Sequence, residues 1–257
     1  MTEASTGSLA IDFSVTPIRH VGDLLDATFT VFRRHFLVIA KIVLLVFLPV
    51  EFVKNYLLYV AGGQESLIRI IRIEQLLEMV FGSLTTPALI YALIAVFRSG
   101  PAPSLGEAFR WGRRQWARTV GNRWLAGMAL VGGLILLVVP GFIVAVMFCL
   151  VDSIVAIEGD NQPHVLRRSR ELTGGHRWML FASGTVCLML IVLAAFILGL
   201  PQGLLDVEHW LFDAVTDCLL DVWYQILHIM LLLAYLSLVA GRERARPAAG
   251  AGGAERS

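Results

Sequence analysis

The sequence predicts an all-α polytopic membrane protein, with six transmembrane helices in three hairpins and a cytoplasmic amphipathic surface helix before each hairpin. Three observations lead to this fold class. Hydrophobic residues make up 57% of the 257 residues and charged residues only 16%, with a mean hydropathy of +0.72, outside the usual range of soluble domains. Six segments approach the roughly 20 apolar residues that a helix needs to cross a bilayer. Basic residues are concentrated in every second connecting segment, as the positive-inside rule requires.

The two ends of the chain differ in composition from the middle. Residues 1–17 are polar and predict a flexible N-terminus without the basic segment and apolar core of a cleavable signal peptide. We therefore expect the first span to act as its own signal. Residues 18–240 predict a single six-span membrane domain, and the tail 241–257, "GRERARPAAGAGGAERS", predicts a disordered cytoplasmic segment.

Two of the six predicted spans are short. The spans cover approximately residues 36–58, 76–97, 124–139, 141–157, 178–200 and 219–240. Between the third and the fourth stands Pro140-Gly141, within "LILLVVPGFIVAVMF". This pair is compatible with one long kinked helix or with a tight hairpin that turns at Pro140 and Gly141.

The distribution of positive charge favours the hairpin. With a turn at Pro140-Gly141, 17 of the 21 positive residues fall on one side of the membrane. A single kinked helix would instead place the four arginines of "EGDNQPHVLRRSRELTGGHRWMLF" on the outer side. The positive-inside rule then predicts that both termini lie in the cytoplasm.

The second cytoplasmic segment, "PSLGEAFRWGRRQWARTV", predicts a surface helix over residues 104–120. Ser104 and Glu107 have the spacing of a capping box, which predicts the helix start. At 100° per residue one face is apolar and the opposite face is basic. The apolar face comprises Leu105, Ala108, Phe109, Gly112, Trp116 and Val120, and the basic face comprises Arg110, Arg114 and Arg118.

Two further segments have the same pattern, over residues 18–34 and 163–173. In the latter, Arg168 and Arg170 flank the apolar face, where their guanidinium groups could reach the depth of lipid phosphates. The chain is therefore interpreted as three units, 18–97, 102–157 and 162–240, each a surface helix followed by a hairpin. Chance similarity among amphipathic helices is the alternative to a true repeat.

A family resemblance rests on Pro140-Gly141, on Glu158-Gly159 and on "RRSRELTGGHRW". These features resemble the membrane domain attached to some bacterial glycerophosphoryl diester phosphodiesterases, which also occurs as stand-alone membrane proteins. The resemblance covers most of residues 15–240. Its strongest matches are Arg168, Ser169, Glu171, Leu172, Thr173, Gly175 and Trp178.

The phosphodiesterase activity of that family belongs to a soluble barrel domain, and nothing of that size follows the six spans. The resemblance therefore implies a membrane module that handles lipid or works beside a separately encoded enzyme, and does not imply the activity itself. No nucleophile elbow, P-loop, HExxH or dinucleotide fingerprint is present, so we expect no enzymatic activity.

Ionisable residues at membrane depth are costly and are therefore candidate functional residues. Asp152 lies in the fourth span, where a helix-packing hydrogen bond is the simplest explanation. In the last helix a polar stripe includes Asp221, Gln225 and His228. It is either a solvated face of an external amphipathic helix or a path for a cation or proton that ends at His228.

No cofactor and no metal are expected. Cys149, Cys187 and Cys218 lie far apart in apolar surroundings, without the spacing of metal ligands, and indicate buried small side chains. The net charge of +1 gives the chain no signature of nucleic-acid binding.

The leading hypothesis for function is a non-enzymatic membrane module whose basic surface helices bind anionic lipid headgroups through Arg110, Arg114, Arg118, Arg168 and Arg170. One alternative is a small transporter that uses the polar stripe of the last helix. Another is a scaffold that docks a protein partner through its cytoplasmic helices, or that forms a homo-oligomer.

Overall fold

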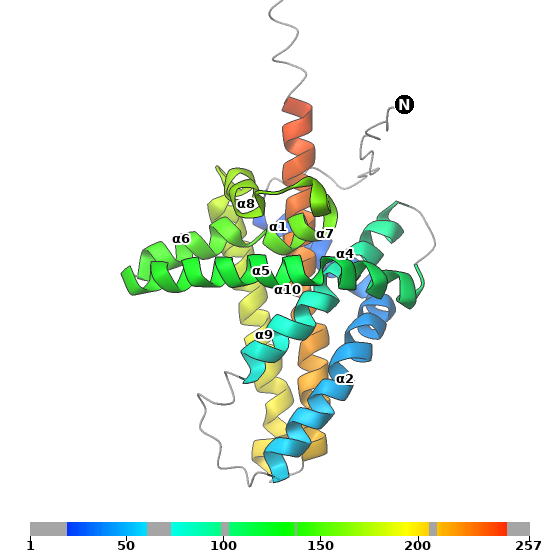
Figure 1. Ribbon diagram of the computed structural model, residues 1–257. Coiled ribbons are helices and arrows are strands. Elements are labelled where there is room, and N and C mark those ends of the chain that lie inside the picture. Colours follow the sequence, from blue (N-terminus) through cyan, green and yellow to red (C-terminus); the bar gives the residue numbers. More distant parts are fainter. Residues whose placement is uncertain (1–19, 61–72, 99–102, 137, 206–209, 246–257) are drawn as a thin grey trace, which may run out of the picture.

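The computed structural model describes residues 20–60, 73–98, 103–136, 138–205 and 210–245, and within these ranges the secondary structure is helical, without strands (Figure 1). This confirms the all-α class. The predicted flexible N-terminus and most of the predicted tail lie outside the described residues. The elements are α1 (Val21–Arg34), α2 (Phe36–Val60), η1 (Glu78–Gly82), α4 (Ser83–Phe97), α5 (Leu105–Leu136), α6 (Val138–Phe148), α7 (Val151–Glu158), η2 (Gly159–Asn161), α8 (Val165–Thr173), α9 (Arg177–Leu205) and α10 (Trp210–Ala245).

Among the described residues, five helices are long and apolar enough to cross a membrane, as expected of a multi-pass membrane protein. They are Phe36–Val60, Ile73–Phe97, Val139–Glu158, Arg177–Pro201 and Trp210–Arg242. The second of them runs through η1 and α4 without leaving the helical conformation. The sequence predicts six spans, and the predicted third span, 124–139, is the one without a counterpart among these five.

This segment continues the helix before it. The sequence predicts a surface helix that ends near residue 120 and a separate span from residue 124, but α5 is one helix of 32 residues. A single glycine at position 121 costs a helix only about 1 kcal/mol, which does not end it. The apolar part of α5 after Arg123 has 13 residues (124–136) and is roughly 20 Å long at 1.5 Å per residue, shorter than a bilayer core of about 30 Å.

The chain reverses between α5 and α6, slightly before the predicted position. Pro140 and Gly141 lie in the first turn of α6, where a proline is tolerated because its missing N–H would have had no partner. α5 ends at Leu136 and α6 begins at Val138, so Pro140 and Gly141 are both helical. Gly133 and Gly141 bring the two helix backbones together, since a Cβ atom at Gly133 would lie 3.1 Å from the Gly141 Cα atom. Gly141 is therefore a point of close contact between α5 and α6.

The predicted fourth span, 141–157, is divided into two helices. α6 ends at Phe148 and α7 begins at Val151. Close to this break, the Ser169 hydroxyl on α8 donates a hydrogen bond to the main-chain carbonyl of Met147 at 2.8 Å. A side chain of α8 therefore stabilises the end of α6.

α10 is the central helix of the structure. Figure 1 shows α2 and α9 alongside its N-terminal half, while α1, α7 and α8 gather around its C-terminal half. α5 and α6 run across these helices. The side chains at the centre are apolar and fully buried, among them Ile226, Ile229 and Met230 of α10.

The short amphipathic helices bury their apolar faces against other helices of the protein. Leu24 and Phe32 of α1 and Leu172 of α8 are at most 5% exposed, and Phe32 packs edge-on against Trp223 of α10 at 5.7 Å. By contrast, α9 exposes a continuous apolar surface, including Val192 (67%) and Phe196 (66%). α2 likewise exposes large apolar side chains, such as Leu37 (70%), so the exposed apolar surface lies on α2, α9 and the α5–α6 hairpin, and not on α1 and α8.

Candidate functional site

The polar positions of α10 face the protein interior. Asp217, Asp221, Gln225 and His228 follow one another at steps of four, four and three, which places them on one face of the helix. Gln225 is 4% exposed and His228 7% exposed. The interpretation of this stripe as a solvated face is therefore wrong for Gln225 and His228, which are buried.

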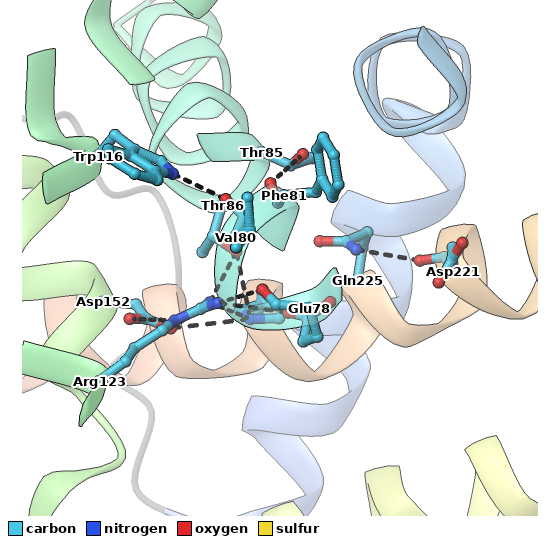
Figure 2. Close-up of polar contacts among 11 residues, drawn as sticks. Glu78, Val80, Phe81, Thr85, Thr86, Trp116, Arg123, Asp152, Asp221 and Gln225 are labelled. Carbon is cyan, nitrogen blue, oxygen red and sulfur yellow. Dashed lines mark hydrogen bonds and ion pairs between the residues drawn. The ribbon is translucent and has the colours of Figure 1, made fainter. Parts of the chain in front are cut away.

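An ion pair between Arg123 and Asp152 lies beside this face (Figure 2). The guanidinium of Arg123, on α5, donates from Nε to Oδ1 of Asp152 at 2.9 Å and from Nη2 to Oδ2 at 2.7 Å. This is the bidentate geometry that makes arginine–carboxylate pairs strong. Asp152, in the first turn of α7, therefore pairs with a basic residue from a neighbouring helix.

Three further side chains complete what we call the inner cluster, comprising Glu78, Thr86, Arg123, Asp152 and His228. Nη2 of Arg123 donates to Thr86 Oγ1 at 3.0 Å and lies 3.4 Å from Nε2 of His228. Nη1 contacts the Glu78 carboxylate at 3.4 Å. One guanidinium therefore connects α5 to α7, to the helix Ile73–Phe97 and to α10.

Glu78 reaches this cluster through a local irregularity. The helix Ile73–Phe97 contains one π-helical turn, η1, and such turns often occur at functional sites. A π turn frees main-chain carbonyls, and here side chains of α5 bind them: Trp116 Nε1 donates to Val80 O at 2.8 Å and Arg123 Nη1 donates to Glu78 O at 3.3 Å (Figure 2). Gly82 leaves room for the Glu78 carboxylate, which a Cβ atom there would displace.

A second group, the outer cluster, lies nearer the N-terminal end of α10 and comprises Glu51, Lys54, Asn55, Glu74 and Asp217. The Lys54 ammonium group pairs with Asp217 at 2.8 Å and also with Glu51 and Glu74. Asn55 donates to Asp217 at 3.0 Å. Glu51 and Lys54 are both buried, and Lys54 also pairs with the carboxylates of Glu74 and Asp217.

The outer cluster has the geometry of a cation site. The ligand oxygens of Glu51, Glu74 and Asp217 all lie within 4.8 Å of one another, and the Lys54 ammonium group is the cation among them. Carboxylate oxygens at such spacing suit hard cations. The sequence predicts no metal here, because Glu74 and Asp217 are remote from Glu51 along the chain.

The residues of the family resemblance hold α8 in place. Arg168 donates to Glu158 at 3.1 Å, and the same carboxylate accepts from the Tyr235 hydroxyl at 2.8 Å. Gly175 has φ +85°, a conformation that favours glycine. Of the remaining positions, Ser169, Leu172 and Thr173 are buried. Glu171 and Trp178 are exposed.

The five arginines predicted to bind lipid headgroups have different surroundings. Arg110, Arg114 and Arg170 are exposed. Arg118 donates to the main-chain carbonyls of Gly159 and Gln162, so it stabilises the loop after α7. Arg168 is likewise engaged inside the protein. The surface available to an anionic lipid is therefore smaller than the sequence predicts.

Sequence reasoning missed Arg123, Glu78, Glu74 and Thr86 as site residues. By sequence, Arg123 belongs to the basic segment before the third predicted span, although it directly precedes an apolar run. Glu78 lies within the predicted span 76–97, and an acidic residue in such a segment was a usable signal. The position of Thr86 gave no signal, since a lone threonine in a span is common.

The comparisons with known proteins identify the family. Residues 72–241 match the sequence model of a domain of unknown function, DUF7847, and because the match covers more than half of the chain, the chain belongs to that family. No curated protein and no solved structure matches the chain. The whole inner cluster lies within the matched residues, whereas Glu51, Lys54 and Asn55 of the outer cluster precede them.

Proposed function

We propose that this member of the DUF7847 family is a non-enzymatic module of the bacterial plasma membrane that binds anionic lipid at its cytoplasmic face. The observation that carries the proposal is the composition of α5. Arg110, Arg113 and Arg114 are exposed on its N-terminal half, and its C-terminal half exposes large apolar side chains. They are Trp124, Leu125, Met128, Val131, Leu134 and Ile135. A helix of this kind suits the boundary between headgroups and acyl chains.

The proposal includes a membrane arrangement with both termini in the cytoplasm. In it, α2, Ile73–Phe97, α9 and α10 cross the bilayer, and the α5–α6 hairpin enters and leaves on the cytoplasmic side. The length of the apolar part of α5 supports a re-entrant hairpin over a full crossing. Three hairpins give six crossings, and four spans with one re-entrant hairpin give four. Both numbers are even, so in either arrangement the termini lie on the same side of the membrane, as the distribution of the arginines requires.

The lipid-binding surface follows from which arginines are exposed. Arginines near an anionic leaflet contribute about 1 kcal/mol each to membrane association. Arg114 also lies over the Trp111 ring at 5.9 Å, and Trp111 stacks on Tyr91 of α4, so the basic surface is attached to a rigid helix pair. Arg118 and Arg168 are left out of the proposed surface because they bind protein groups.

A non-enzymatic role is supported by the absence of known catalytic motifs from the sequence and by the pairing of the charged side chains in the inner cluster. The resemblance to the membrane domain of glycerophosphoryl diester phosphodiesterases agrees with a module that works beside a separately encoded enzyme. That link is part of the proposal and does not follow from membership in DUF7847.

Native mass spectrometry of the full chain, with lipids retained, tests the proposal. We expect more bound phosphatidylglycerol than phosphatidylcholine, and a several-fold loss of this preference in the double variant Arg110→Glu/Arg114→Glu. Arg33→Glu/Arg34→Glu is the matched control, since these arginines are exposed on α1. Equal binding of both lipids, or an equal loss in the control, would contradict the proposal. A protein that co-purifies without any lipid preference would favour the scaffold alternative.

A further inference from the structure

A groove of about 810 Å³ lies between α2 and the helix Ile73–Phe97. Its lining side chains belong to residues 46–58 of α2 and 73–84 of the other helix, and among these described lining residues Lys54 is the polar one. The volume is within the range of roughly 300–1,000 Å³ that is usual for small-molecule sites. A groove of this size and composition suits a hydrocarbon chain.

The position of Lys54 gives the level of the groove in the membrane. Lys54 follows Phe36, the first residue of α2, by 18 positions, or roughly 27 Å along a helix, which is close to the hydrocarbon thickness of about 30 Å. In the membrane arrangement proposed above, on which this inference rests, Lys54 therefore lies near the outer headgroups. The groove continues inward to Val46 over roughly 12 Å, most of the depth of one leaflet.

The outer cluster adjoins the groove through Lys54 and carries more negative than positive groups. Lys54 pairs with the three carboxylates of Glu51, Glu74 and Asp217, whose ligand oxygens all lie within 4.8 Å of one another. These oxygens therefore converge on one point. The charge left over at that point is negative, so it attracts a cationic group and repels an anionic one.

Two of the three carboxylates can be reached from outside. The side chains of Glu74 and Asp217 are 46% and 33% exposed, whereas that of Glu51 is 3% exposed. The contacts with Lys54 use Oε1 of Glu74 and Oδ2 of Asp217, and an ionised carboxylate has two oxygens that each accept hydrogen bonds. Acceptor capacity for a second ammonium group therefore remains on both side chains.

We propose that the groove holds an acyl chain of an outer-leaflet phospholipid whose primary ammonium headgroup binds the carboxylates of Glu74 and Asp217. The apolar lining accounts for the chain, and the excess of carboxylates accounts for the headgroup. A primary ammonium group donates hydrogen bonds to carboxylates, and such charge-assisted bonds are the strong ones. A choline headgroup has the same charge but no N–H to donate.

This site is separate from the anionic-lipid surface on α5. That surface attracts lipids through the exposed arginines Arg110 and Arg114, and the groove selects its lipid through carboxylates on other helices. The two sites therefore prefer opposite headgroup charges. Variants at one site should leave the lipid preference of the other unchanged.

Native mass spectrometry of the full chain tests the inference. The protein is purified in detergent and given an equimolar mixture of phosphatidylethanolamine and phosphatidylcholine with identical acyl chains. We expect about tenfold more bound phosphatidylethanolamine, the ratio that corresponds to one hydrogen bond between charged groups. Because both lipids have the same chains and neither has a net charge, the ratio measures recognition of the ammonium group.

Two variants with matched controls test the headgroup and the chain separately. Glu74→Gln should lower the ratio several-fold, and Glu171→Gln, which removes a similarly exposed carboxylate on α8, should leave it unchanged. Val53→Trp should lower the binding of both lipids several-fold, because the indole fills the groove. Val192→Trp on α9 is its control, since both valines are largely exposed, at 59% and 67%. Elution from size-exclusion chromatography verifies that each variant is folded.

A preference for phosphatidylethanolamine that falls in Glu74→Gln and persists in both controls supports the site. Equal binding of the two lipids by the parent, or a Glu74→Gln protein that keeps the preference, would overturn it. Val53→Trp that binds lipid as the parent does, or that converts a dimer into a monomer without loss of lipid, would also overturn it. So would a loss of the preference in Arg110→Glu/Arg114→Glu, whereas loss of phosphatidylglycerol binding alone in that variant concerns only the surface on α5.

Discussion

The inner and outer clusters both surround a basic side chain with carboxylates, but they differ in how well the charge is matched. In the inner cluster the planar guanidinium of Arg123 meets Asp152 with two hydrogen bonds and also contacts Thr86. In the outer cluster the single ammonium group of Lys54 is shared by three carboxylates. Arginine offers a fixed fork of donors, whereas lysine is a compact point charge.

The two clusters therefore differ in their structural roles. The inner cluster is a clamp, because four helical segments meet at one guanidinium that has a full set of partners. The outer cluster carries excess negative charge, because one ammonium group is shared by three carboxylates. Variants that remove each basic group should separate these tasks.

Arg123→Met should give the largest effect, because it leaves Asp152 without its partner in a site from which water is largely excluded. Breaking a buried pair by removing one partner lowers the free energy of unfolding by roughly 3–5 kcal/mol. Thermal unfolding in detergent measures this loss. Arg123→Met/Asp152→Leu should recover much of it, and a double variant as unstable as the single one would contradict the assignment of a clamp.

Lys54→Met should give the second largest effect. We expect it to lower the free energy of unfolding by roughly 3 kcal/mol in the absence of added salt. The loss is smaller than for Arg123 because the side chains of Glu74 and Asp217 are 46% and 33% exposed and can recruit water or cations. Unfolding at increasing NaCl measures the recovery. If the loss of unfolding free energy does not change with the Na⁺ concentration, the carboxylates of the outer cluster are as inaccessible to cations as those of the inner cluster.

Tyr235→Phe tests a buried neutral partner of a carboxylate outside both clusters. Tyr235 is 3% exposed and its hydroxyl donates to Glu158 at 2.8 Å, so removal of the hydroxyl should cost about 1.5 kcal/mol. Arg168 still pairs with Glu158 in the variant, which keeps the carboxylate compensated. A loss above that of Lys54→Met would mean that charge balance is not what distinguishes the clusters.

Glu107→Ala should give the smallest effect and provides the exposed reference. The main-chain N–H of Ser104, followed by its hydroxyl, donates to the Glu107 carboxylate and lowers the pKa of this group below its ordinary value. Such a group stabilises the protein above its ordinary pKa, and the effect disappears as the pH falls through the lowered pKa. Unfolding of parent and variant at neutral and acid pH should therefore differ only at neutral pH.

The sequence predicted those parts of the fold that depend on local pattern. The start of α5 at Leu105, the surface position of Arg110 and Arg114, and the single polar face of α10 follow from helical periodicity and capping. The continuation of α5 through Gly121 could not be predicted, because packing against α4 decides whether one glycine ends a helix.

The sequence predicted Asp152 and the α10 residues of the candidate site, but not their partners. Asp221, Gln225 and His228 share a face by spacing alone. Their partners Arg123, Asp152 and Glu78 come from three other helical segments, and which of these contact α10 depends on tertiary packing. The π turn that directs Glu78 toward Arg123 has no sequence signature that separates it from an ordinary helical turn.

The central claim is that the polar face of α10 lies in the protein interior while α9 faces lipid. It is tested most directly by labelling single cysteines with a lipid-soluble maleimide in native membranes, in a chain whose Cys149, Cys187 and Cys218 are replaced by alanine. Phe196→Cys should label readily, because Phe196 is 66% exposed on α9, whereas His228→Cys should stay unlabelled until the protein is denatured. Equal labelling at both positions in the folded protein would contradict the account.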